Sequence, residues 1–310
     1  MEMKLLTEKE FNEYIPSFSK LFEVSFNRKI KEEFFKWRYL DNPVKDLLVA
    51  VAIDKGEIVA NYSVSPMLVE RDGNVYKTAI SMTTMTHPKY EGRGLFNSLA
   101  KMIYDEMKRR NYVAVWGFPN SISHGVFIKK LGWKDVYEIP TMSLNLDKLE
   151  MIKNNDDFNV VKNNCFDIFE NEVQNHNYHT KKSKEYYQWR YAKHPYNIYE
   201  NYVVEKDQEY VGNMVIKIYN NSIDIIEFNF IEDEEIKVAI HYLINLGIKN
   251  KYQRISGWVN LFNTSHTTFE RLGFENTKPI TYFSLKNIIN DSLTLNYKDY
   301  DFSMGDSDVY

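Results

Sequence analysis

The sequence predicts an α/β (α+β) fold built as two tandem copies of one domain. Two repeated motifs indicate the duplication: FFKWRYLDNP at 34–43 returns as YYQWRYAKHP at 186–195, and VFIKKLGW at 126–133 returns as TTFERLGF at 267–274. Repeats at so long a spacing indicate duplicated globular domains rather than a solenoid. In the first copy, the order strands, glycine-rich loop, helix, strand and helix predicts a sheet with at least one crossover connection.

The two copies are expected to occupy residues 1–148 and 149–310. Both motifs keep their order in each copy, which is more than chance similarity would produce. The join is expected in MIKNNDDFNVVKNN, a polar stretch rich in Asn and Asp, because such composition is typical of loops.

The elements of the first copy follow from its apolar patterns. DLLVAVAID and IVANYSVSPMLVER are joined by KGE into a predicted hairpin, and RDGN turns the chain into the strand segment VYKTAISMTTMTH. Residues 95–110 place apolar side chains at helical spacing and end in cations that complement the helix dipole. VAVWGF at 113–118 predicts a buried strand, and residues 121–131 predict a short helix that Gly132 ends.

Composition excludes several classes of protein. The 310 residues are 44% hydrophobic and carry a net charge of −4, which argues against a nucleic-acid surface. One cysteine, Cys165, cannot form an internal disulfide or a multi-thiolate metal site. Neither a signal peptide nor a run of apolar residues long enough to span a membrane is evident. We therefore expect a cytoplasmic monomer or homodimer with no metal and no nucleic-acid or membrane partner.

The loop HPKYEGRGLF at 87–96 places Gly92 and Gly94 on either side of Arg93, directly before the predicted helix. The first N–H groups of a helix have no intrahelical partner, and glycine lets a diphosphate approach them. The alternative is an ordinary loop in which glycine supplies a positive φ. The loop lacks the Gly-Lys-Ser/Thr end of a P-loop, and Asn97 stands where the dinucleotide fingerprint has its third glycine.

The stretch from TMTHPKYEGRGLF to FIKKLGW resembles the acyl-CoA N-acyltransferase family with the GNAT fold, over about residues 45–146. The resemblance implies that each copy is a GNAT-like domain with a mixed, mostly antiparallel central sheet flanked by helices. It also implies acetyl-CoA or another acyl-CoA as co-substrate. Gly94 matches the family motif, whereas Glu91 replaces the usual Arg or Gln and Phe96 replaces the usual Gly or Ala.

This resemblance implies a coenzyme site around the glycine turn. The turn would hold the pyrophosphate, the preceding strand would pair with the pantetheine arm, and the strand at 113–118 would splay away to leave a slot for the thioester. Asn120 and Ser123 could equally cap the following helix. The implied coenzyme-binding residues are Thr84, Met85, Thr86, Glu91, Gly92, Arg93, Gly94, Leu95, Phe96, Asn97, Asn120, Ser123 and Phe127.

The catalytic groups are less clear, because Ile128 stands where many members of the family have a general-acid tyrosine. An amine would attack the acyl carbonyl directly, and a base would accept its proton. The candidate catalytic residues are His124, Tyr137 and Tyr310, the last through a C-terminal carboxylate on a tail that folds back. Tyr90 or a water could also replace the missing tyrosine. His124 could instead be a surface histidine, and the tail an ordinary one.

Trp37 and Arg38 are candidate acceptor-binding residues in the first WRY motif. The alternative is a structural role, in which Trp packs in the core and Pro ends the helix. Because the motif is also present in the second copy, it cannot be tied to coenzyme chemistry.

The second copy has no glycine turn. Four acids, at 232–235, occupy the start of the corresponding helix. Acids suit the helix dipole but would repel a diphosphate. We expect the second copy to have no coenzyme site.

The expected function is N-acetyl transfer from acetyl-CoA, or a related acyl-CoA, to a primary amine of a small molecule or amino sugar. One alternative is a non-catalytic coenzyme-binding or interaction module. Another is aminoacyl transfer from charged tRNA onto a peptide by paired GNAT-like domains, which the net charge of −4 disfavours.

Overall fold

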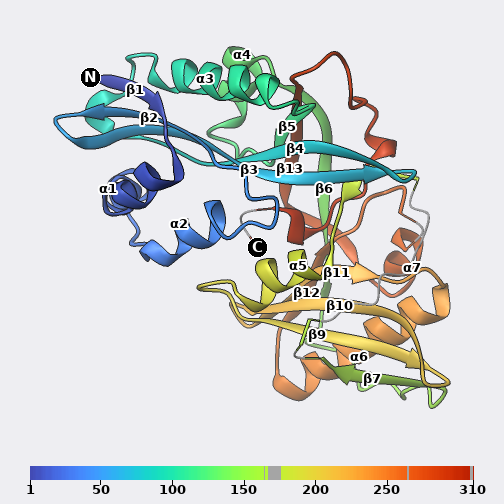
Figure 1. Ribbon diagram of the computed structural model, residues 1–310. Helices are drawn as coiled ribbons and strands as arrows, with labels where there is room; N and C mark the ends of the chain where they lie inside the picture. Colours follow the sequence, from blue (N-terminus) through green and yellow to red (C-terminus); the bar gives the residue numbers. More distant parts are fainter. Residues whose placement is uncertain (164, 167–175, 264, 308–309) are drawn as a thin grey trace. The chain divides into compact units, whose positions relative to one another are not determined.

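The computed structural model describes residues 1–163, 165–166, 176–263, 265–307 and 310 (Figure 1). The chain forms two compact units, each assembled from three segments. The first unit comprises Met1–Tyr137, Lys193–Tyr196 and Tyr282–Tyr297, and the second comprises Glu138–Ala192, Asn197–Thr281 and Lys298–Tyr310. Within the described ranges, no helix combines the length and apolar character that crossing a bilayer demands.

The sheet of the first unit is mixed and mostly antiparallel. Neighbouring strands pair antiparallel except β4 and β5, which are parallel. In spatial order its strands are β1 (Glu2–Leu5), β2 (Leu48–Asp54), β3 (Glu57–Arg71), β4 (Asn74–Thr86), β5 (Ala114–Gly117) and the last part of β13 (Glu275–Asn287).

Helices cover both faces of this sheet (Figure 1). α1 (Glu8–Phe26) and α2 (Glu32–Tyr39) cover one face; α3 (Leu95–Arg109) and α4 (His124–Leu131) cover the other. Alternation along β2 explains the two layers, since Val49 and Val51 pack in the core under α1 while Ala50 and Ala52 pack in the core under α3. The short 3₁₀ turn η1 (Pro88–Tyr90) leads from β4 to the glycine turn.

The second unit repeats the plan. Its strands pair antiparallel except β11 and β12, which are parallel. α6 (Asp233–Asn250) supplies the main apolar layer on one face of the sheet. In spatial order the strands are β6 (Lys134–Asn145), β12 (Arg254–Trp258), β11 (Ser222–Asn229), β10 (Glu209–Tyr219), β9 (Tyr199–Lys206) and β7 (Phe158–Lys162). The smaller elements are β8 (His179–Thr180), α5 (Lys184–Tyr187), η2 (Gln188–Ala192), α7 (His266–Arg271), η3 (Tyr297–Asp299) and η4 (Met304–Asp306).

The chain exchanges one strand between the two sheets. β6 follows α4 along the chain, yet residues 141–145 pair with β12 in the second unit. β13 follows α7, yet residues 284–287 pair with β5 in the first unit. The predicted fold class, mixed and mostly antiparallel sheets flanked by helices, is therefore confirmed. The join after residue 148 stays a prediction for the repeated sequences, whereas the exchanged strands make each folded unit discontinuous.

Candidate active site

Strands β4 and β5 diverge in the first unit. Their parallel pairing ends at Ile80 and Trp116, although β4 continues to Thr86. In β4, Thr83 and Thr84 lie opposite the single β3 residue Tyr62, and Thr83 has a φ of 50°, which marks a β-bulge. Among the described residues, no strand pairs with β4 on its β5 side beyond Ile80. Beyond Ile80 the backbone groups of β4 therefore face a fork between the two strands, as expected if the strand at 113–118 splays away from β4.

Gly117 lies at the start of this fork. A Cβ on Gly117 would stand 3.2 Å from the main-chain oxygen of Ser81, tighter than ordinary contact, so glycine lets the strands pass closely before they separate. Thr84 and Thr86 are half-buried beside the fork, whereas Met85 points its side chain into the core under α1. Only the backbone of Met85 can therefore meet a ligand in the fork.

The glycine turn leads from this fork to α3. Gly92 and Gly94 have φ values of 73° and 76°, and a Cβ on either would meet no atom within 4 Å. Glycine is required here by backbone conformation rather than by packing. Gly94 is the N-cap of α3, and no side chain caps the helix. Its first N–H groups are thus open to an anion at the positive end of the helix dipole.

Side chains of the turn fix its shape. The Tyr90 hydroxyl donates to Asp54 at 2.7 Å, and this bond raises the pKa of Tyr90 and lowers that of Asp54. Arg93 donates to the main-chain oxygen of Lys89 at 3.0 Å and lies over the Tyr90 ring. Glu91, Arg93 and Asn97 are exposed. Tyr90 therefore anchors the turn, and Arg93 places a positive charge beside it.

The helix after β5 begins three residues later than predicted. Asn120 accepts hydrogen bonds from the main-chain N–H groups of Ile122 and Ser123, at 3.1 and 2.9 Å. This is the capping alternative for Asn120, and Ser123 becomes the N-cap residue of α4. Phe127 is buried, with its ring 5.6 Å from that of Phe96. These two predicted coenzyme-binding residues therefore pack α4 against α3.

His124 lies in a small polar cluster at the start of α4. Its Nε2 is 2.7 Å from Oδ1 of Asp135 on β6, and its ring stacks on Tyr282 of β13 with centroids 4.3 Å apart. Ser284 donates to the same Asp135 oxygen at 2.7 Å. Of this cluster only His124 is a candidate from the sequence, because its partners come from strands distant in the chain and no local pattern marks them.

The other predicted site residues lie apart from this cluster. Tyr137 stacks on Tyr297 with ring centroids 5.1 Å apart. Trp37 and Arg38 are buried in α2, and Arg38 Nε donates to the sulfur of Met82 on β4. The burial of Trp37 agrees with the structural alternative for that residue. Arg38 contacts Met82, which lies beyond Ile80, where β4 and β5 separate.

Tyr310 belongs to the second unit, which has a corresponding fork. The parallel pairing of β11 and β12 ends at Ile225 and Gly257, and β11 continues to Asn229. Residues 303–307 and Tyr310, the described part of the C-terminal segment, fill this fork. Gly305 lies against the side chain of Glu227 on β11, and the ring of Tyr310 packs on Trp258 at the end of β12.

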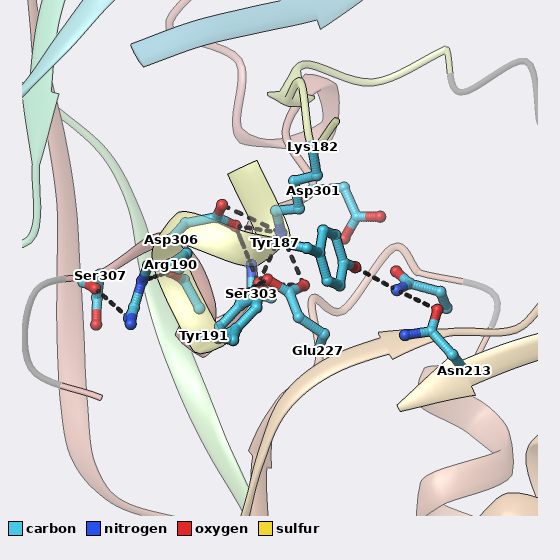
Figure 2. A network of polar contacts seen from close by, with 12 residues as sticks. Lys182, Tyr187, Arg190, Tyr191, Asn213, Glu227, Asp301, Ser303, Asp306 and Ser307 are labelled. Atoms are coloured by element: carbon cyan, nitrogen blue, oxygen red, sulfur yellow. Dashed lines mark hydrogen bonds and ion pairs between the residues drawn. The ribbon is translucent and has the colours of Figure 1, made fainter. Parts of the chain in front are cut away.

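Buried polar groups hold the C-terminal segment there (Figure 2). Lys182 Nζ is 2.7 Å from Glu227 and 3.2 Å from Asp306. Burial disfavours the charge of Lys182, but these two carboxylates raise its pKa well above the usual value. Ser303 donates to Glu227 at 2.9 Å, and Tyr191 donates to the other oxygen of that carboxylate.

Arg190, the second-copy counterpart of Arg38, binds the backbone of the same segment. It donates to the main-chain oxygens of Gly305, Ser307 and Tyr310 at 3.0, 3.1 and 2.8 Å. Tyr199 also donates to the Tyr310 oxygen, at 2.9 Å. The tail therefore folds back, as one of the two expectations held, and its end is bound by an arginine.

The start of α6 differs from that of α3 as expected. The carboxylate of Glu235 accepts from the main-chain N–H of Glu232 at 3.2 Å, in a capping box. The acids thus satisfy this helix start internally. Over the described part of the chain, no group of three or more His, Cys, Asp or Glu side chains could hold a metal ion.

A family comparison covers most of the first unit. Residues 2–136 match the family described as acetyltransferase (GNAT) domain. Among curated proteins, no sequence matches the chain.

Solved structures resemble most of the chain. A probable N-acyltransferase from Enterococcus faecalis has a TM-score of 0.69 at 13% identity, over 93% of this chain and 72% of that chain. A GCN5-related N-acetyltransferase from Anabaena variabilis has a TM-score of 0.69 at 10% identity, over the same shares of 93% and 72%. Another from Kribbella flavida has a TM-score of 0.64 at 11% identity, again over 93% and 72%. At such identities the likeness establishes the fold.

Proposed function

From the premise that residues 2–136 form a GNAT acetyltransferase domain, we propose that the chain transfers an acyl group from acetyl-CoA, or a related acyl-CoA, to a primary amine. The acceptor would be a small molecule or an amino sugar. One observation carries the proposal: the open fork between β4 and β5 leads through Gly92–Gly94 to the uncapped start of α3. A thioester arm and a diphosphate have the lengths and charges that suit these two adjoining features.

The coenzyme would lie along the unpaired edge of β4. The backbone of Thr84, Met85 and Thr86 would bond the pantetheine arm, and the turn from Glu91 to Asn97 would hold the pyrophosphate. Positive charge from the helix dipole and from Arg93 would offset the phosphates. Asn120 and Ser123, at the start of α4, would border the arm, and Phe127 would support them from the core.

Catalysis would depend chiefly on how the fork positions the amine and the thioester. The amine nitrogen attacks the thioester carbonyl, a C–N bond forms, and the C–S bond breaks to release the coenzyme thiol. Holding both reactants in the fork removes most of the entropic cost, and N–H groups at the bulge near Thr83 are suited to polarise the carbonyl oxygen. The amine proton leaves during this step, and His124 and Tyr137, both in the first unit, remain the candidates to accept it. Trp37 and Arg38 would bound the acceptor side of β4.

A second candidate is a coenzyme-binding module without turnover. Ile128, at the position of the family's tyrosine acid, packs against the apolar core beneath α3 and cannot donate a proton. Binding without catalysis would account for that side chain.

Calorimetric titration with acetyl-CoA tests the proposed site. We expect one coenzyme per chain. Gly94→Glu should weaken binding roughly 100-fold or more, about 2.7 kcal/mol, because it adds a negative charge at the helix start. Gly94→Asn is the matched control, since Asn tolerates the left-handed backbone and adds no charge; it should stay within roughly fivefold of the parent.

Turnover is measured as free thiol over a panel of primary amines. An amine-dependent release of thiol supports transfer, whereas saturable binding without release on any amine supports the binding module. Absence of acetyl-CoA binding, or two coenzymes per chain, contradicts the proposed site.

A further inference from the structure

Position 124 lies one helical turn before position 128 on the same face of α4. Helical side chains lean toward the N-terminus, so a long side chain at position 128 would cover the turn that contains residue 124. The hydroxyl of a tyrosine at 128 would thus be directed to the place where the His124 ring begins. Ile128 leaves that place to the histidine.

The protonation pattern of His124 follows from its partner. An ionised carboxylate can only accept hydrogen bonds, so the 2.7 Å contact with Asp135 requires a proton on Nε2. The nitrogen that gains and loses a proton is then Nδ1. Within the part of the chain that the structure describes, no residue makes a hydrogen bond to Nδ1.

Two residues of β13 restrain this pair. Tyr282 stacks on the imidazole with an interplanar angle of 14° and sets the plane of the ring. Ser284 bonds Asp135 and sets the direction of the carboxylate. A histidine that merely covered the surface would need neither restraint, because solvent would satisfy both nitrogens. Asp135 and Tyr282 are the titratable groups in contact with His124.

The pair lies close to the fork. Ser284 is the cross-strand partner of Gly117, which stands against Ser81 where β4 and β5 separate. Neighbouring strands are about 4.8 Å apart, so Ser284 is one strand from β5, which forms one side of the fork. The cluster therefore lies beside β5 on the side away from β4, one strand from the fork in which the thioester would lie.

We propose that His124, positioned by Asp135 and Ser284, is the general acid that protonates the departing coenzyme thiolate in place of the absent tyrosine. This inference rests on the proposed function. As the amine nitrogen forms its bond to the acyl carbon and the C–S bond breaks, the sulfur takes the proton of Nδ1, leaving a neutral imidazole bonded to Asp135. The proton released by the amine restores the imidazolium through solvent, so no proton is gained or lost overall.

The test is a set of variants assayed for acetyl-CoA binding and for steady-state kinetics with the best amine of the panel. His124→Ala should lower kcat about 100-fold, the order expected for loss of a general acid, and leave the dissociation constant of acetyl-CoA unchanged. Asp135→Asn should lower kcat about tenfold.

Rescue distinguishes catalysis from structure. The double variant His124→Ala, Ile128→Tyr restores the family's tyrosine where the imidazole has left room, and it should regain at least tenfold in kcat over His124→Ala. His241→Ala, on α6 of the second unit, is the matched control and should keep the parent kcat. Thermal melting of every variant identifies any that fail to fold, and the rescue is then read on the folded members.

Each outcome has one meaning. If the parent protein neither binds acetyl-CoA nor releases thiol, the proposed function fails and the acid has no reaction to serve. If the parent turns over and His124→Ala retains its kcat, the inference about His124 is wrong while the function stands. Loss of kcat in His124→Ala without rescue by Ile128→Tyr also overturns it and leaves His124 a structural residue.

Discussion

The two strand forks of this chain begin alike and end differently. In each, a pair of parallel strands separates directly before a bulge in the earlier strand, at Thr83 in β4 and at Ile226 in β11. The first fork keeps half-buried polar residues along β4. In the second, Glu227 is only 1% exposed because the C-terminal segment covers it. Strand divergence therefore does not by itself define a ligand site; what fills the fork decides.

The helix starts beside the two forks differ in the same sense. α3 begins at a glycine with no side-chain cap, whereas α6 begins with a capping box of glutamates. An uncapped start leaves N–H groups for an external anion, and a carboxylate cap satisfies them from within. The open fork and the uncapped helix start occur together in the first unit, which supports the proposed coenzyme site there.

Among the changes to the second fork, removal of Lys182 should destabilise the protein most. Lys182→Met would leave Glu227 and Asp306 buried side by side without their cation. Losing one partner of a buried charge cluster costs about 3–5 kcal/mol. We expect a decrease of that size in the free energy of unfolding, measured by urea denaturation, together with faster proteolysis of the C-terminal segment.

Lys206→Met is the matched control. Lys206 pairs with Glu234 at 3.1 Å, but both side chains are largely exposed, so the decrease in unfolding free energy should be much smaller than for Lys182→Met. Equal losses for the two lysines would show that the network around Lys182 does not stabilise the tail.

Part of the difference between the two forks can be predicted from the sequence, because it depends on residues that are close together in the chain. Glycines with positive φ, the helix at 95–110 and the acids at 232–235 each follow from residue type and periodicity over a few positions. The capping role of Asn120 was an open alternative for the same reason.

The remaining features depend on residues distant in the chain. The exchange of β6 and β13 depends on which sheet edge each strand joins. The apolar pattern of a strand does not specify that edge. Asp135 and Ser284 meet His124 only through that exchange. Lys182, Glu227 and Asp306 look like surface charges in the sequence, because nothing local marks burial beneath a folded-back tail.

Asp224 offers a pH-dependent test of the second fork. Asp224 comes one residue before Ile225, the last β11 residue that pairs with β12. Ala79 has the same position in β4, one residue before Ile80, so the two residues correspond. Burial raises the pKa of Asp224 to about 6, against opposing effects of Lys217 and Arg254. The folded state therefore keeps a proton that the unfolded state loses, and the stability that this provides is present below about pH 4 and lost as the pH rises through about 6.

Asp224→Asn should remove this pH dependence. The variant should exceed the parent by up to about 3 kcal/mol in unfolding free energy above pH 6, and match it below pH 4. Urea denaturation at pH 4, 5, 6 and 7 measures the difference. Asp207→Asn, in the exposed turn before β10, is the control and should change stability by less than about 0.5 kcal/mol at every pH. A constant difference between Asp224→Asn and the parent would show that folding does not raise the pKa of Asp224.

Gly305 tests how tightly the tail fills the second fork. A Cβ at this position would overlap the Glu227 carboxylate and the Tyr191 hydroxyl, both of which are held by other bonds. Overpacking of a filled site costs about 1–3 kcal/mol, so Gly305→Ala should destabilise by that amount and expose the tail to protease. The backbone φ of Gly305 needs no glycine, so the effect would report packing alone.

Gly125→Ala is the matched control, since a Cβ there meets no atom within 4 Å. Gly125 lies inside α4, where alanine is favoured by about 1 kcal/mol over glycine, so this variant should be slightly more stable than the parent. If Gly305→Ala proved equally neutral, the tail would pack loosely against β11 and the second fork could open. Acetyl-CoA titration of that variant would then show whether an opened second fork binds a coenzyme, which the acid-capped start of α6 opposes.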